Sequence, residues 1–131
     1  MQYEQDYIMR MIRQVIHGLI GVLLNKKTTP EYEIPANRQQ NTGDNLFQRL
    51  AVLADKGKIC AAENILLEAL DSGTDEAFMT ALQFYDHIND YDDDFLEVNN
   101  FSREEIRLGI LSLAEQMGKY AMAAPLFGDL N

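Results

Sequence analysis

The sequence is poor in the residues that form most metal sites and covalent catalytic sites. Its 131 residues include one cysteine, two histidines and no tryptophan. A single cysteine cannot form a disulfide within the chain, which fits a reducing, cytoplasmic setting. These residue types alone also cannot supply the four ligands of a closed zinc site. We therefore expect neither a disulfide framework nor a bound metal.

Nucleotide-binding and phosphate-binding loops are missing as well. The sequence contains no G-x-G-x-x-G run and no Walker-type loop, and its aromatic residues do not alternate with basic ones. Cys60 has no supporting signature of a catalytic nucleophile, so we interpret it as a small packing residue. The sequence thus predicts no enzymatic activity and no cofactor.

Positive charge is scarce. The chain carries 11 Lys or Arg residues against 21 Asp or Glu residues, for a net charge of −10. Residues 1–43 hold five basic and four acidic residues, net +1, whereas residues 44–131 hold six basic and seventeen acidic residues, net −11. A surface this acidic repels phosphate backbones, so we expect no nucleic-acid partner.

Strand patterns are absent, and helical patterns take their place. No segment alternates apolar and polar residues between turn signals, whereas 47% of the residues are hydrophobic, enough for a core. The sequence predicts an all-α protein with helical hairpins and a long N-terminal amphipathic helix. We divide it into that helix at 1–27, a proline-containing linker at 28–43 and a helical-hairpin body at 44–131, one domain overall.

The first helix is expected from Tyr3 to Leu24. Apolar residues cover about half of its circumference, and polar residues, His17 among them, occupy the other side. Three placements stay open for the apolar face: across several helices of the same domain, against a second copy of the chain, or on a membrane surface. The residues of this candidate interaction face are Ile8, Ile12, Val15, Ile16, Leu19 and Leu23.

Neither a signal peptide nor a membrane span is expected at this helix. The segment begins with the acidic residues Glu4 and Asp6, no small-residue cleavage site follows, and its uninterrupted apolar run is short. Lys26 and Lys27 at its end suit lipid headgroups and a helix C-terminus equally well.

A helical hairpin is predicted from Leu46 to Leu70, with its turn at Gly57 and Asp44 as the N-cap of its first helix. Part of its spacing returns 61 residues later (118 minus 57), and 61 is not a multiple of 34. A generic hairpin therefore fits better than a repeat array. The spacing, which resembles that of tetratricopeptide hairpins, consists of Gly57, Ile59, Ala62, Leu66 and Ala69, echoed by Gly118, Tyr120, Ala123 and Phe127.

Two further helices and a short one complete the body. The first is expected at 75–89 with Thr74 as its N-cap. Ser102 and Glu105 form a capping box for the next, and a short helix at 119–127, weakened by Pro125, follows. The residues expected to face inward are Phe78, Ala81, Leu82, Tyr85, Ile88, Ile106, Ile110, Leu113 and Met117.

The segment from Asp90 to Phe101 is expected to be an acidic turn. Its aspartates at 90, 92 and 94 match three positions of an EF-hand loop, but phenylalanines replace the required glycine and glutamate. We therefore predict a solvated turn instead of a calcium site. The stretch from Asp90 to Glu97 is a candidate surface through which a partner-dependent regulator would meet a basic protein. His87 is interpreted as a helix-end histidine beside these acids.

Three stretches together resemble a family of small bacterial helical proteins of unknown function. They are QDYIMRMI at 5–12, GKICAAENILLEAL at 57–70 and NFSREEI at 100–106. The resemblance supports the helical fold and implies no activity, and its likeness to tetratricopeptide hairpins suggests protein contact. The positions that would clamp a peptide carboxylate are apolar or acidic here, so no such clamp is expected: Phe47, Ala51, Ala54 and Asp55.

The function predicted from these features is a non-enzymatic protein-interaction module. It would self-associate through the first helix as a dimer, or bind another protein. The alternative is a peripheral membrane protein whose first helix docks on acidic lipid through Arg10, Arg13, Lys26 and Lys27. Replacing Ile12 and Leu19 by aspartate is the test that this prediction suggests for the dimer.

Overall fold

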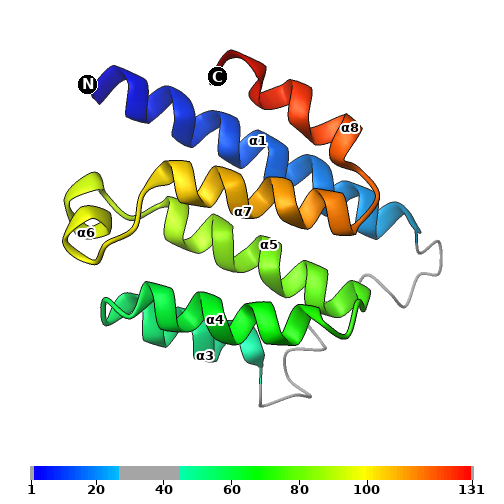
Figure 1. Ribbon diagram of the computed structural model, residues 1–131, viewed down its shortest axis with the longest axis horizontal. Helices are drawn as coiled ribbons and strands as arrows, with labels where there is room; N and C mark the ends of the chain where they lie inside the picture. The colour runs from blue at the N-terminus through cyan, green and yellow to red at the C-terminus, as the bar shows by residue number, and fades with distance from the viewer. Residues whose placement is uncertain (1, 27–44, 131) are drawn as a thin grey trace.

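Helix α5 (Asp75–Asn89) is the element around which the others are arranged. In the computed structural model, which describes residues 2–26 and 45–130, it contacts four helices. Figure 1 shows the N-terminal helix and α7 on one side of α5 and the first hairpin on the other. These four helices are α1 (Gln2–Lys26), α3 (Leu46–Asp55), α4 (Ile59–Leu70) and α7 (Arg103–Gln116).

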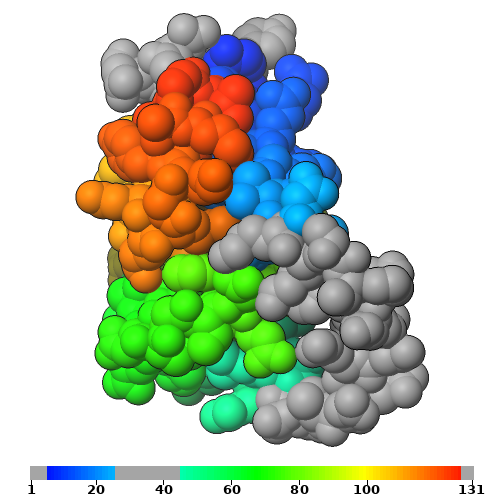
Figure 2. Space-filling model, turned by 90° about the vertical axis from the view of Figure 1, so that its right-hand side faces the viewer, coloured from blue at the N-terminus to red at the C-terminus, as the bar shows by residue number. Residues whose placement is uncertain are grey.

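The remaining elements are short. Helix α6 spans Asp93–Val98, α8 spans Tyr120–Ala123, and the 3-10 helix η2 spans Ala124–Leu130. The C-terminal segment packs against α1, and Figure 2 shows it lying beside that helix. The weakening expected at Pro125 takes the form of this change from α-helix to 3-10 helix.

The fold class is confirmed: the described residues form helices and no strand, with a long N-terminal helix followed by helical hairpins. The hairpin turn lies at Gly57, whose φ of 91° is accessible to glycine but costly for other residues. The predicted linker at 28–43 lies outside the described residues, so the proposed domain boundaries stay a prediction.

Side chains cap the starts of α3, α5 and α7. Thr74 Oγ1 accepts a hydrogen bond from the Ala77 amide at 3.1 Å, and Ser102 Oγ accepts one from the Glu105 amide at 3.2 Å, as predicted. The cap of α3 is Asn45, which accepts from the Gln48 amide at 3.1 Å. The prediction of Asp44 for this role was wrong, and Asp44 itself lies outside the described residues.

The core contains every residue expected on the inner face of α5. It also contains Phe84, which the single-face prediction missed. A helix that touches four others is covered on more than one side, so periodicity understates its burial. Met117 is only half-buried at the end of α7.

The acidic segment after α5 contains the short helix α6, so the prediction of a turn from Asp90 to Phe101 was wrong for residues 93–98. Asp92 accepts a hydrogen bond from the Phe95 amide at 2.9 Å and thereby caps α6. Asp93 and Asp94 occupy its first turn, where the helix dipole favours negative charge, and Leu96 is buried. The carboxylates that suggested a solvated loop instead start a helix.

Candidate functional site

The apolar face of α1 lies in the core of its own chain. Of the candidate interaction residues, Ile8 is half-buried and the other five are buried: Ile12, Val15, Ile16, Leu19 and Leu23. They pack on the side of α1 that meets α5, α7 and η2, while His17 on the opposite side is exposed, as expected. The first of the three placements is therefore the one seen in the structure.

We expected no membrane span in the first helix, but the segment Asp6–Asn25 is long and apolar enough to cross a membrane by length and composition alone. Core helices of soluble proteins meet the same criterion. Five apolar residues of this segment are buried in the core, whereas Tyr7 and Leu24 are exposed. Arg13 pairs with Asp86 and Asp90, so it is already engaged by the protein. Lys27 lies outside the described residues, as does the side chain of Lys26.

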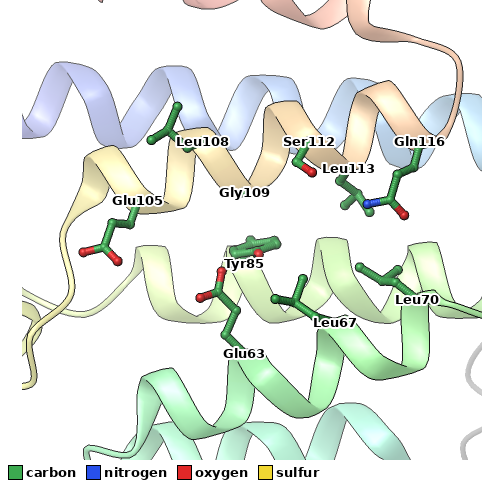
Figure 3. Close-up of a pocket in the computed structure, with 10 residues that line it drawn as sticks. All are labelled: Glu63, Leu67, Leu70, Tyr85, Glu105, Leu108, Gly109, Ser112, Leu113 and Gln116. Carbon is green, nitrogen blue, oxygen red and sulfur yellow. Dashed lines mark hydrogen bonds between the residues drawn. The ribbon is translucent and has the colours of Figure 1, made fainter.

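A shallow groove lined by α4, α5 and α7 lies open to solvent and has a volume of about 310 Å³ (Figure 3). The buried side chains of Leu70, Tyr85 and Leu113 form its floor. Leu67 on α4 and Leu108 on α7 are 46% and 51% exposed, respectively, so both walls offer apolar surface to solvent. The remaining lining residues are Glu63, Glu105, Gly109, Ser112 and Gln116.

The floor of the groove depends on a glycine. A Cβ atom on Gly109 would lie 2.5 Å from the Tyr85 hydroxyl oxygen and 2.6 Å from Cζ, so only glycine lets the tyrosine lie against α7. The hydroxyl donates a hydrogen bond to Glu63 Oε2 at 2.7 Å. Burial, followed by the nearby Glu63 charge, raises the pKa of Tyr85, so the hydroxyl remains a donor at neutral pH.

One end of the groove is acidic. Burial raises the pKa of Glu63, the charge of Glu105 raises it further, and the Tyr85 hydrogen bond opposes both effects. Among the described residues, no basic side chain pairs with either glutamate, although basic residues pair with carboxylates elsewhere. Those pairs join Arg13 to Asp86 and Asp90, His87 to Asp55, Arg103 to Asp93, and Arg107 to Glu104.

Cys60 lies near this acidic end. Its side chain is exposed, so its interpretation as a small packing residue was wrong. The preceding residue, Ile59, takes the buried position at the start of α4. Burial of the thiol, small as it is, and the charges of Glu105 and Glu63 raise the pKa of Cys60, which disfavours the reactive thiolate.

A second polar cluster joins α3 to α5. His87 Nε2 lies 2.9 Å from Asp55 Oδ1, and the Tyr91 hydroxyl donates to the same oxygen at 2.5 Å. The hydrogen bonds from Tyr91 and His87, in that order, lower the pKa of Asp55. The sequence placed His87 beside its neighbouring acids, whereas its observed partner comes from another helix. The described residues contain no group of three or more His, Cys, Asp or Glu that could hold a metal ion.

The model of one protein family, described as a family of unknown function (DUF6483), matches residues 2–118. This range covers α1 to the end of α7 and includes every residue that lines the groove. No curated protein and no solved structure matches the chain. The expected resemblance to a family of unknown function is confirmed, whereas the likeness to tetratricopeptide hairpins stays a prediction.

Proposed function

Because the chain belongs to DUF6483, a family of unknown function, its family implies no activity, and we propose from its surface that it is a non-enzymatic protein-binding module. The groove between α4 and α7 is the proposed binding surface. The observation that carries this proposal is the pair of half-exposed leucines, Leu67 and Leu108, that face solvent above a buried apolar floor.

Apolar walls open to solvent favour a partner that brings apolar side chains of its own. Burying a leucine side chain yields about 1.5–3 kcal/mol, so filling a groove between two such residues provides useful binding energy. Polar groups at its edges, including Ser112 and Gln116, can orient a partner through hydrogen bonds. A helix or short segment laid into a groove between two helices is a common mode of protein recognition.

The residues that line the groove support binding better than catalysis. They include carboxylates, a buried tyrosine hydroxyl and a serine, but neither of the two histidines of the sequence. Ser112 therefore has no imidazole in the lining to act as a general base. The carboxylates lie at one end of the groove, whereas Ser112 lies on α7 beyond Gly109 (Figure 3).

Self-association through α1 stays a separate prediction. Because its apolar face is in the core of the same chain, a dimer formed through that face would require α1 to leave its own body and enter another. Docking of the same face on a membrane would require the same departure. The groove is accessible without either rearrangement.

Selection from a display library of short random peptides tests the proposal. We expect the protein to select peptides that bind saturably and compete with one another for one site. Replacing Leu108 by aspartate should weaken their binding about tenfold or more, because a charge replaces an apolar wall of the site. Fluorescence anisotropy of labelled peptides measures the dissociation constants.

Val52→Asp is the matched control. Val52 lies on α3, is 53% exposed and does not line the groove, so the same charge is introduced at an equally exposed apolar position. Peptide binding should survive this change. Failure to select any saturable binder, or equal effects of Leu108→Asp and Val52→Asp, would contradict the proposed function.

A further inference from the structure

The two walls of the groove present the same order of residues. Along α4 the lining residues are Glu63, Leu67 and Leu70, and along α7 a glutamate, Glu105, again precedes a leucine, Leu108. In Figure 3 the two glutamates lie toward one end of the groove, while Leu70 and Gln116 lie toward the other. The groove therefore has a direction, with an acidic end followed by an apolar stretch.

The carboxylates at the acidic end lack the paired basic side chains that other carboxylates have in the described part of the protein. Glu105 has a local role, because it belongs to the capping box of α7. Glu63 on α4 is half-buried, and it accepts a hydrogen bond from the neutral Tyr85 hydroxyl. Two carboxylates without a paired cation attract one, and the half-buried Glu63 contributes more than the exposed Glu105 because burial reduces the dielectric screening between charges.

We propose that the partner is a cationic amphipathic helix, which places apolar side chains between Leu67 and Leu108 and a lysine or arginine beside Glu63 and Glu105. This inference rests on the proposed function of the groove. Apolar anchors one helical turn apart and a basic residue one turn beyond them match the spacing along α4.

Charge also decides between this partner and a second copy of the chain. Residues 44–131 carry a net charge of −11, so two bodies repel each other, whereas a cationic segment is attracted from a distance. Specific pairing at the acidic end would then set the direction in which the partner lies in the groove.

Parallel selections from the same random-peptide library test this inference. One uses the wild type, one uses Glu105→Lys, and one uses Glu97→Lys, which changes the net charge equally at an exposed position of α6 outside the groove. We expect the wild type and Glu97→Lys to select peptides with Lys or Arg one turn from an apolar pair. Glu105→Lys should select Asp or Glu at that position.

Synthetic peptides then make the comparison quantitative. The wild type should bind a selected lysine peptide about tenfold or more tightly than its lysine-to-glutamate version, and Glu105→Lys should reverse that preference. Glu63→Gln, which retains an acceptor for Tyr85, should weaken the lysine peptide several-fold. Circular dichroism of each variant verifies that the helices are intact.

The outcomes separate this inference from the function on which it rests. Two outcomes would contradict a cationic partner but still support a groove that binds proteins. In the first, the selected peptides require Leu108 but show no preference for basic residues. In the second, Glu105→Lys selects the same residues as the wild type. A selection with no saturable binder would overturn both.

Discussion

At the scale of single residues, the contact of Gly109 with Tyr85 sets how closely α5 and α7 approach. A methyl group at position 109 would overlap the tyrosine ring, which is buried and held by Glu63. Gly109→Ala should therefore lower the free energy of unfolding by about 1–3 kcal/mol, even though alanine favours the helix by roughly 1 kcal/mol. Urea denaturation monitored by circular dichroism measures the change.

Gly21→Ala is the control for this prediction. Gly21 also lies within a helix, and a Cβ atom there would meet nothing within 4 Å. Helix propensity should act alone at this position, raising the free energy of unfolding by about 1 kcal/mol. If both alanine substitutions stabilise the protein, Tyr85 moves at no cost and the close contact does not limit the packing.

The residue patterns predicted which side chains are buried better than they predicted the hydrogen-bond partners of those side chains. The spacing of Tyr85 within α5 correctly placed it in the core, but its hydroxyl meets Glu63, 22 positions earlier on another helix. Cys60 was interpreted as a packing residue because cysteine is usually buried, yet its side chain is exposed and the preceding Ile59 takes the buried position. The helical period predicts which face of a helix a residue lies on, whereas its hydrogen-bond partner depends on how the helices pack against one another.

At the scale of elements, Arg103 joins the start of α7 to the end of α5. Its guanidinium is buried and donates to the backbone oxygens of Asn89 at 3.1 Å and Tyr91 at 2.6 Å, and it lies 3.2 Å from Asp93. The last carbonyls of a helix have no partner within the helix, so this side chain completes α5. Arg103→Ala should reduce the free energy of unfolding by about 2–4 kcal/mol in a denaturant titration.

Glu104→Ala serves for comparison in the same helix. Glu104 is exposed and pairs with Arg107 one turn later, so its replacement removes the ion pair and leaves the mostly buried Arg107 side chain in place. Such surface pairs contribute about 0–1 kcal/mol, so this variant should be nearly as stable as the wild type. Equal losses in the two variants would show that the contacts of Arg103 with α5 add nothing to stability.

Elements with clear start signals were predicted closely. Thr74 and the Ser102–Glu105 pair located the starts of α5 and α7, and the predicted span 75–89 agrees with the structure. Helix α6 was missed because its density of aspartates suggested a solvated turn. The same aspartates stabilise the start of a helix when apolar residues, here Phe95 and Leu96, follow to pack against the core.

At the scale of the whole molecule, α1 belongs to the same core as the body. Leu19 is fully buried among residues of the shared hydrophobic cluster. Leu19→Asp should therefore destabilise the entire fold, because a buried charge without a partner is costly. Circular dichroism should show a loss of helicity over the whole chain, and sedimentation equilibrium should be run on the same sample.

A variant that keeps its helicity would instead support a dimer formed through α1. If Leu19→Asp keeps its helicity while the sedimenting mass drops from about twice 14.9 kDa in the wild type to 14.9 kDa, then α1 is shared between two copies. The original test with Ile12 and Leu19 therefore needs this measure of helicity, since both positions are fully buried.

The sequence left the placement of α1 open because a wide apolar stripe looks the same on a core helix, at an interface and on a membrane. The groove could not be foreseen at all. Its walls come from two helices that are separated in the sequence by α5 and α6, and its opening depends on how both pack on α5. Local patterns carry no information on a space that only the assembled helices create.

The exposed position of Cys60 gives the groove a chemical handle. It is the single cysteine of the sequence, and its thiol lies close enough to Glu63 and Glu105 for their charges to act on it. A thiol-reactive dye would therefore attach at one place, near the acidic end of the groove. The fluorescence of the attached dye would then change when the lysine or arginine of a bound partner arrives there. The labelled protein would thus report binding in the groove optically.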